Sequence, residues 1–542
     1  MTGTFTAPHV DWAQLAPVIL VLGAAVIGVL VEAFVPARVR RPVQLTLSLV
    51  ALVGAVTATA LLWHGVRTTG GTVVLGGAMI LDGPALVIQG AVAALALLSL
   101  LVIADRSSGE DAFSPQAAGV PGSDYEELAR RQGLVQTEVF PLVLFATGGM
   151  MIFPAAGDLL TLFVALEVLS LPLYLLTGLA RRRRLLSQEA SMKYFLLGAY
   201  ASAFFLFGTA LLYGFAGSVR FSDIATAIGT VTGMDTLLFA GAGLVLVGLF
   251  FKVGAVPFHS WTPDVYQGAP TPITGFMAAC TKIAAFGAML RIVYVVLPGL
   301  VWDLRPALWG VAILTMVVGT VVALVQTDVK RILAYSSIAH AGFVLTGVVS
   351  LDPKGISGVL FYLLAYGVAT VGGFAVVTLV REKATAQVLV GAAGAGSGTA
   401  VGGSETVLGE ATHVSQWAGL GRRHPWIAGA FSLFLLSFAG IPLTAGFIGK
   451  FTVFSAAVAG GAAPLAVVGV LVSAASVFFY VRIIVLMYFT DDAEASASAG
   501  TTVVSGRLTG IVVGVCAALT VLLGVFPSPV LEIVQQAAKF IS

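Results

Sequence analysis

Apolar segments long enough to cross a membrane recur along almost the whole chain. Residues 15–35, for example, contain a single charged side chain, Glu32. About 20 mostly apolar residues cross a hydrocarbon layer of roughly 30 Å as a helix. Only 10% of the residues are charged and 58% are hydrophobic, whereas soluble domains carry about 25% charged residues. The sequence therefore predicts an all-α membrane protein.

A hydropathy window of about 19 residues predicts about fourteen transmembrane helices. Their centres lie near residues 25, 54, 94, 145, 168, 205, 245, 284, 316, 341, 368, 440, 476 and 516. Loops after odd-numbered spans hold most lysines and arginines. The opposite face, both tails included, holds only Arg67, Arg220, Arg291, Arg305, Lys354 and Lys539. Because positive charge accumulates in cytoplasmic loops, both termini are expected on the outer side.

The spans and the polar stretches between them predict five sections. In order they are 1–104 (three N-terminal transmembrane helices), 105–136 (cytoplasmic loop), 137–298 (first repeat), 299–490 (second repeat, with a cytoplasmic Gly-rich loop at 384–424) and 491–542 (C-terminal transmembrane helix). The Gly-rich loop has too few large apolar side chains to fold alone. Both loops are therefore interpreted as flexible connectors.

Four ionisable side chains lie deep inside predicted spans, namely Glu167, Lys252, Lys282 and Lys450. A charge at the membrane centre costs about 2.5–3.5 kcal/mol on insertion scales, so packing alone does not explain this set. The alternatives are snorkelling of Lys252 or Lys282 toward the interface and a local hydrogen bond between Glu167 and Ser170. Intramembrane ionisable groups of this kind indicate an ion or proton pathway.

His340 adds a group that titrates near neutral pH. It shares a helix face with Ser336 and Ser337, although a lone histidine is often only a satisfied core residue. Lys193 and Arg482 lie nearer the ends of their spans, where interfacial anchoring is an equal alternative. Since lysine, histidine and glutamate together cover the pKa range of a water-linked relay, the sequence predicts proton transfer.

Other classes of function find little support. The two cysteines, Cys280 and Cys516, hold neither an iron–sulfur cluster nor a disulfide framework. The sequence shows no HExxH motif, P-loop or GxSxG elbow, so neither a cofactor nor a metal is expected in this chain. The net charge of +2 gives no sign of a nucleic-acid partner, and none is expected.

Two lysines mark an internal repeat. Lys252 lies beside Gly254 and Pro257 in the seventh span, and Lys450 follows a Gly-Ile-Pro interruption in the twelfth. Broken helices at corresponding places are typical of inverted-repeat transporters. Five spans separate the two lysines, and an odd number of spans reverses orientation in the bilayer. Spans 4–8 and 9–13 are therefore predicted to form two inverted five-helix repeats, with helices 7 and 12 broken.

Three motifs carry a resemblance to a known family. They are residues 251–272 (FKVGAVPFHSWTPDVYQGAPTP), 327–340 (TDVKRILAYSSIAH) and 440–451 (GIPLTAGFIGKF). Together they closely resemble subunit N of bacterial NADH–quinone oxidoreductase (respiratory complex I), an antiporter-like membrane subunit family. The resemblance runs from about residue 137 to 490. The M-type sister subunits differ in carrying glutamate where this chain has Lys450.

This resemblance implies a translocase subunit of fourteen helices, with two inverted units, in the bacterial plasma membrane. Protons would cross through it while quinone is reduced elsewhere in the complex. Flavin, iron–sulfur clusters, NADH and quinone would belong to partner subunits. Those partners would include sister antiporter-like subunits and small membrane subunits, all embedded in lipid.

The resemblance also implies roles for single residues. Glu167 and Lys252 would form a pair that modulates proton affinity, Lys282 and His340 the central relay, and Lys450 the exit-side group. Supporting residues would be Lys193, His259, Ser336 and Ser337. The alternative function is a subunit of a cation/proton antiporter complex, whose relatives differ in the 262–272 stretch. A passive scaffold is disfavoured, because an idle bundle has no reason to keep costly buried charges.

Overall fold

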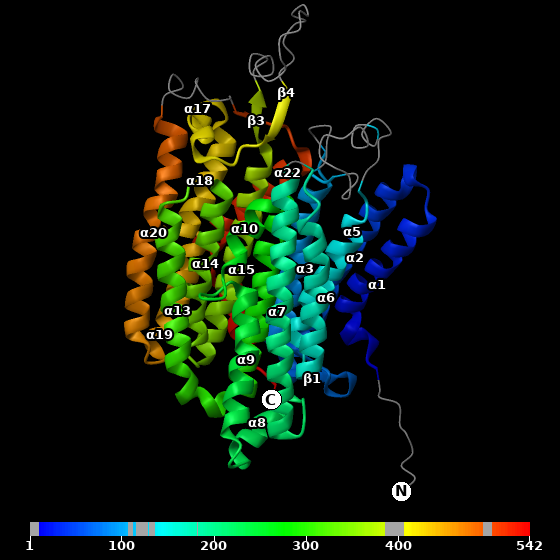
Figure 1. The fold of residues 1–542 in the computed structure, drawn as a ribbon, viewed down its shortest axis with the longest axis vertical. Helices are drawn as coiled ribbons and strands as arrows, with labels where there is room; N and C mark the ends of the chain where they lie inside the picture. Colours follow the sequence, from blue (N-terminus) through cyan, green and yellow to red (C-terminus); the bar gives the residue numbers. More distant parts are fainter. Residues whose placement is uncertain are drawn as a thin grey trace, which may run out of the picture.

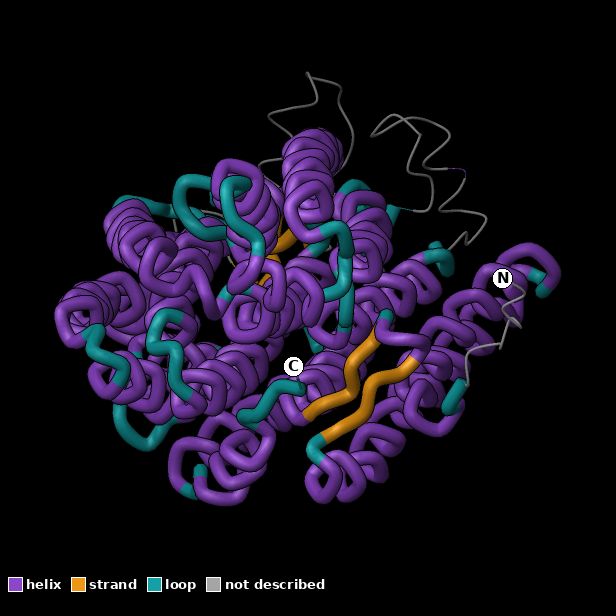
Figure 2. Tube along the Cα trace, turned by 90° about the horizontal axis from the view of Figure 1, so that it is seen from below, coloured by secondary structure: helices purple, strands orange, loops and turns teal. Residues whose placement is uncertain are grey.

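The computed structural model describes residues 10–106, 112–114, 128, 136–181, 183–384, 406–490 and 501–541. It is a bundle of long helices that run roughly along one axis (Figure 1). Seen along that axis, the helices stand end-on and pack side by side (Figure 2). The prediction of an all-α membrane protein is confirmed, and the short strands lie at the ends of the bundle.

The first section contains three helices and a hairpin: α1 (Trp12–Phe34), α2 (Ala37–Thr69), β1 (Gly71–Val74), β2 (Met79–Asp82) and α3 (Gly83–Ala104). Asp11 caps α1 by accepting from the amides of Ala13 and Gln14, as N-cap carboxylates do. Helix α2 ends at Gly70 in the left-handed conformation, φ 83°, which glycine adopts without strain.

The first half of the bundle follows. Its elements are α5 (Val139–Ile152), η2 (Phe153–Ala155), α6 (Leu159–Thr177), α7 (Arg184–Ala216), α8 (Phe221–Thr230), α9 (Asp235–Val253), α10 (Trp261–Gly268), α11 (Thr271–Phe276), the π-helical turn η3 (Met277–Thr281), α12 (Lys282–Arg291) and a second π-helical turn η4 (Ile292–Val296). Helices α11 and α12 run on through η3 as one almost fully buried rod. This rod forms part of the centre of the bundle.

The second half contains η5 (Pro298–Leu300), α13 (Val301–Leu324), α14 (Val329–Val348), α15 (Pro353–Leu379), α18 (Pro425–Ala439), α19 (Ala445–Ala459) and α20 (Ala463–Phe489), and the chain then continues into α22 (Arg507–Val525) and α23 (Ser528–Ala537). Helix α15 is the other almost fully buried rod. It packs against α11, α14, α18, α19 and α22. The two central rods are therefore enclosed by the remaining helices.

Within the described residues, eleven helices are long and apolar enough to cross a membrane. The remaining predicted spans fall on α5, on α14, and on the pair α18 and α19. The predicted centre at residue 440 lies at the turn between the last two. Each of the fourteen predicted spans thus corresponds to helical structure.

Both helix breaks predicted from the sequence are present in the structure. Helix α9 ends at Val253 and is followed by Gly254 at φ 75°. Helix α18 ends at Ala439 and is followed by Gly440 at φ 80°. Each glycine has the left-handed conformation that stops a helix at little steric cost. Whether the two halves match as inverted repeats stays a prediction.

Part of the stretch expected to be a flexible connector is folded. Of residues 384–424, the described part forms β4 (Thr406–Glu410), the 3-10 turn η6 (Val414–Trp417) and α17 (Leu420–Arg423). Strand β4 pairs antiparallel with β3 (Val380–Ala384), which also pairs with β5 (Thr501–Val503). These pairings join segments far apart in sequence, which composition does not reveal. Residues 385–405, and most of the 105–136 loop, lie outside the described residues.

The two ends of the bundle differ. Strands β3 and β4 lie at one end and β1 at the other (Figure 1). At the β1 end, Thr72 Oγ1 donates to Gln14 Oε1 near the start of α1, at 2.6 Å. The amide of Ile541 donates to Asp82 Oδ2 at 3.3 Å. Both ends of the described chain therefore lie on the hairpin side, as an even number of spans requires.

Arg291 is not the loop residue that the sequence predicts. It ends α12 and is completely buried. Its guanidinium forms an ion pair with Asp82 Oδ1 at 2.8 Å, and its Nε donates to Pro154 O at 2.7 Å. The Phe540 ring covers it at 5.0 Å. A carboxylate supplied from far away in the sequence makes this burial tolerable.

Candidate functional site

Lys252 lies in the last turn of α9 and points toward α6 and α7. Its ammonium donates to Ser170 Oγ on α6 at 2.7 Å. The rings of Tyr174 and Tyr194 flank it, with centroids 6.0 and 5.5 Å from Nζ. Aromatic faces attract cations at such distances. One hydroxyl and two rings thus hold a lysine that is only 3% exposed, so it does not snorkel to the interface.

Glu167 lies on α6 one turn before Ser170, but it does not touch Lys252. Within the described residues, no ion pair joins the two, and Glu167 Oε1 is buried without a hydrogen-bond partner. The alternative of a local hydrogen bond from Ser170 to the Glu167 carboxylate is also absent, because the Ser170 hydroxyl donates to Leu166 O. A serine hydroxyl has one hydrogen, and the backbone takes it here. The α6 side chain that binds the Lys252 ammonium is therefore Ser170 and not Glu167.

The helix break beside Lys252 leaves carbonyls at the end of α9. The amides of Gly254 and Ala255 bond to Phe251 O and Phe250 O, at 3.1 and 2.9 Å. The indole nitrogen of Trp261 also donates to Phe251 O, at 2.8 Å. Local groups satisfy these carbonyls, so the Lys252 ammonium takes none of them.

Lys282 begins α12, directly after the π-helical turn η3. Single π-helical turns within α-helices are frequent at functional sites. Its ammonium donates to Ser337 Oγ on α14 at 2.6 Å and also to the Ser337 carbonyl. The Tyr366 ring on α15 lies 5.6 Å from Nζ. The predicted Lys282 and Ser337 are therefore brought into direct contact.

His340 lies where α14, α15 and α20 meet. Its Nδ1 lies 2.6 Å from the Tyr362 hydroxyl, and its Nε2 lies 3.3 Å from the Tyr480 hydroxyl. Tyr480 also bonds to Ser336 Oγ at 2.5 Å. Sequence reasoning found His340 and Ser336 but missed both tyrosines. Their signal is that a phenol inside an apolar span usually finds a hydrogen-bond partner.

Lys450 lies in α19, after the second break, and is surrounded differently. Its ammonium donates to the carbonyls of Phe438 and Ala439, at 2.8 and 2.9 Å, and to Ser473 Oγ at 2.7 Å. Both carbonyls belong to the last turn of α18, the negative end of that helix dipole. The Phe343 ring adds a contact at 4.9 Å.

Two proposed supporting residues lie apart from these groups. Lys193 is half-exposed and pairs with Glu189 and Asp264, each at 2.7 Å. This surface cluster fits the interfacial alternative. His259 lies in the break after α9, half-buried, and its Nδ1 has no hydrogen-bond partner. Neither residue is hydrogen-bonded to Lys252, Lys282, His340 or Lys450.

A further buried charge cluster lies at the β3–β4 end. Glu410 on β4 accepts from the Thr271 hydroxyl and lies 3.6 Å from Lys330 Nζ and 3.9 Å from an Arg381 guanidinium nitrogen. Burial alone would raise the pKa of Glu410, but the nearby cations outweigh burial and hold that pKa below its usual value. Lys330 also donates to Ala269 O at 2.7 Å. Glu410 thus joins the starts of α11 and α14, a link that the sequence did not predict.

Comparison with known proteins agrees with the resemblance that the three sequence motifs carry. The family model described as "NADH:quinone oxidoreductase/Mrp antiporter, TM" matches residues 156–478. The NADH-quinone oxidoreductase subunit N of Beutenbergia cavernae is 63% identical, over 99% of this chain and 99% of that protein.

Two solved structures share the fold. A chain of Thermus thermophilus respiratory complex I with bound aureothin superposes with a TM-score of 0.73 and 31% identity, over 96% of this chain and 100% of that one. A chain of the Mrp complex from Dietzia sp. gives a TM-score of 0.75 at 22% identity, over 96% and 97%. The second shows likeness of fold alone. The chain therefore belongs to the NADH:quinone oxidoreductase/Mrp antiporter transmembrane family, among the relatives of NADH-quinone oxidoreductase subunit N.

Proposed function

We propose that this chain is the proton-translocating membrane subunit N of an NADH–quinone oxidoreductase. The observation that carries the proposal is the set Lys252, Lys282, His340 and Lys450. Each of these side chains is 3–5% exposed, and each bonds to polar groups on another helix. Such groups are expensive inside a membrane and mark ion or proton pathways.

Each residue has a distinct role in this proposal. Glu167 modulates the proton affinity of Lys252 without touching it, because its charge lies near enough to favour the ammonium. Lys282 and His340 exchange protons at the centre of the bundle. Lys450 receives the proton in the second half and releases it on the outer side.

The proposal also includes the orientation of the chain in the membrane and its partner subunits. Both termini lie on the outer side of the bacterial plasma membrane, as the distribution of lysine and arginine indicates. Flavin, iron–sulfur clusters and quinone belong to partner subunits, and the energy of quinone reduction reaches this chain through them. Sister antiporter-like subunits, small membrane subunits and lipid are the neighbours.

The alternative is a subunit of a cation/proton antiporter complex. The specific observation in its favour is the TM-score of 0.75 to the Mrp complex chain. Co-purification with flavin- and iron–sulfur-containing subunits favours the oxidoreductase. Sodium-dependent proton flux without those subunits favours the antiporter.

The test is Lys252→Met in the assembled complex, with Lys354→Met as the matched control. Lys354 is exposed at the start of α15, so its loss removes a lysine from outside the buried set. We expect Lys252→Met to lower NADH-driven proton pumping strongly while the complex still assembles. Undiminished pumping by an intact Lys252→Met complex would refute the proposed role.

A further inference from the structure

The hydrogen-bonded groups between Lys282 and His340 form two separate chains. One runs from His340 Nε2 through the Tyr480 hydroxyl to Ser336. The other joins Lys282 to Ser337. Ser336 and Ser337 are neighbours on α14, but successive residues of a helix point about 100° apart. The two chains therefore end close together without meeting.

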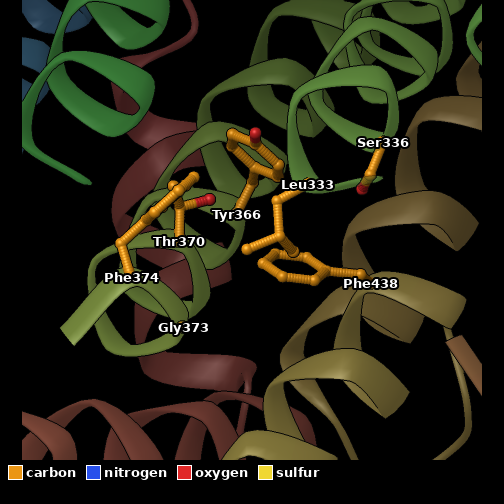
Figure 3. A pocket seen from close by; sticks show the side chains of 7 residues that line it. All are labelled: Leu333, Ser336, Tyr366, Thr370, Gly373, Phe374 and Phe438. Carbon is orange, nitrogen blue, oxygen red and sulfur yellow. The ribbon is translucent and has the colours of Figure 1, made fainter. Parts of the chain in front are cut away.

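A cavity lies at the end of the first chain, between α14, α15 and α18 (Figure 3). The hydroxyl-bearing residues Ser336, Tyr366 and Thr370 line it together with Leu333 and Phe438. Its volume of about 10 Å³ matches the space that the centre of one water molecule occupies. It is thus large enough for one water and too small for a substrate.

Thr370 gives the cavity an unsatisfied polar group. It is 2% exposed, and its Oγ1 makes no hydrogen bond of normal geometry, although it lies within reach of the Tyr366 phenol. Buried hydroxyls without a partner are unfavourable, and buried water commonly supplies the missing bond. The Tyr366 phenol also lies beside Ser337, where the second chain ends. Thr370 therefore marks the gap between the two chains.

We propose that one water molecule, held by Thr370 and Ser336 in this cavity, joins the two chains, and that the Tyr480 hydroxyl carries protons between this water and His340. The inference rests on the proposed function. It adds Tyr480 as a residue that carries the proton and Thr370 as a positioning residue, neither of which the lysines and histidine alone reveal.

The transfer balances as a series of proton hops. The Lys282 ammonium gives a proton to Ser337 Oγ, which passes its own proton to the Tyr366 phenol, and that phenol passes one to the water. The water then protonates Ser336, Ser336 protonates Tyr480, and Tyr480 protonates His340 Nε2. Lys282 ends neutral and His340 ends as imidazolium. Each hydroxyl has gained one proton and lost one. The path requires the histidine tautomer with its proton on Nδ1, which donates to Tyr362.

The decisive experiment compares Thr370→Val with Thr370→Ser in the assembled complex. Valine keeps the shape of threonine and removes the hydroxyl, whereas serine keeps the hydroxyl. The matched control is Thr378→Val on the same helix, because Thr378 does not line the cavity and its hydroxyl donates to Phe374 O at 2.9 Å. We expect Thr370→Val to lower proton pumping severalfold, and Thr370→Ser and Thr378→Val to pump like wild type.

Each outcome is informative. If Thr370→Ser pumps as poorly as Thr370→Val, packing and not the hydroxyl is responsible, and the water site is wrong. If Thr370→Val pumps normally while Lys252→Met does not, the water site is wrong but the proposed function stands. Normal pumping by Lys252→Met defeats the proposed function itself.

Tyr480→Phe tests whether the Tyr480 hydroxyl carries the proton, because it removes the phenolic oxygen and leaves the ring in place. Its matched control is Tyr488→Phe on the same helix. We expect a severalfold loss of pumping for Tyr480→Phe alone. Should Tyr480→Phe fail to assemble, density for the wild-type complex decides: a water within hydrogen-bond distance of Thr370 Oγ1 supports the proposal, and an empty cavity overturns it.

Discussion

The two lysines beside the helix breaks have opposite surroundings. Lys252 is held by one hydroxyl and two aromatic rings, with a carboxylate in the neighbourhood. Lys450 is held by two backbone carbonyls and one hydroxyl. Carbonyls at a helix end have a fixed direction and cannot ionise, whereas a carboxylate can change its charge. The first site is therefore adjustable, and the second is fixed.

The order of residues along the chain explains this difference. Side chains on a helix lean toward its N-terminus. Lys252 precedes its break and so leans back along α9, away from the freed carbonyls and toward α6. Lys450 follows its break and leans toward the start of α19, where the last carbonyls of α18 lie. The reversed order of lysine and glycine thus gives two broken helices different chemistry.

The largest expected effect comes from Gly440→Ala, which disturbs the fixed site directly. A Cβ there would lie 2.8 Å from Lys450 Cδ, at a residue with φ 80°. A left-handed residue with a side chain costs roughly 1–2 kcal/mol, and Lys450 must also move. We expect proton pumping per assembled complex to be lost, as measured by acidification of proteoliposomes.

Gly254→Ala is the control for that prediction. It has similar backbone strain, at φ 75°, but its Cβ would meet Thr262 Oγ1 at 2.9 Å and not Lys252. Assembly should fall by a similar amount in both variants, while the complexes that do form with Gly254→Ala still pump. Equal loss of pumping in the two would contradict the difference between the sites.

An intermediate effect is expected from the two serines that accept from the lysines. Ser170 is the hydroxyl acceptor that holds Lys252, whereas Lys450 keeps two carbonyls if Ser473 is lost. A hydrogen bond to a charged group contributes about 1.5–3 kcal/mol, which corresponds to about ten- to hundredfold. Ser170→Ala should slow pumping by about that factor, and Ser473→Ala by about threefold or less. The pumping rates of the two assembled complexes measure this, and the reverse order would mean that the carbonyls do not hold Lys450.

The smallest effect concerns Glu410, whose charge cluster joins α11 to α14 outside both sites. Its pKa is lowered in the folded protein, so its contribution is present above the unfolded value of about 4.3 and is lost as pH falls through the folded pKa. Glu410→Gln should cost about 1–3 kcal/mol at pH 7, seen as a lower thermal midpoint of the purified complex. The difference in thermal midpoint between Glu410→Gln and wild type should narrow below about pH 4.3. A difference that does not depend on pH would show that the charge of Glu410 does not cause the loss of stability.

The sequence predicted the buried groups better than their partners. Hydropathy placed Lys252, Lys282, His340 and Lys450 inside the bundle, because a charge within an apolar run stands out in one dimension. Ser336 and Ser337 were also predicted, but the tyrosines and the serines that accept from Lys252 and Lys450 were not. These partners come from helices far apart in the chain, and a single hydroxyl in a span does not stand out in the sequence. Lys252 bonds to Ser170 and makes no ion pair with Glu167, and the predicted effect of Glu167 on the proton affinity of Lys252 stays a prediction.

The strands at the β3–β4 end were missed for a related reason. Residues 406–410 belong to a stretch whose composition indicates a connector, and their order depends on pairing with residues 380–384. Trp417, which anchors the following turn, is fully buried and donates to Ala411 O at 2.8 Å. A single tryptophan among glycines and alanines was the available signal.

The central claim is that buried amines and an imidazole carry protons through this chain. The most direct measurement is the number of protons pumped per NADH oxidised, in proteoliposomes with wild-type or Lys282→Met complex. Lys282 contacts Ser337 and lies at the junction of the two halves, so its loss should lower this ratio while assembly remains intact. An unchanged ratio in a fully assembled Lys282→Met complex would contradict the account.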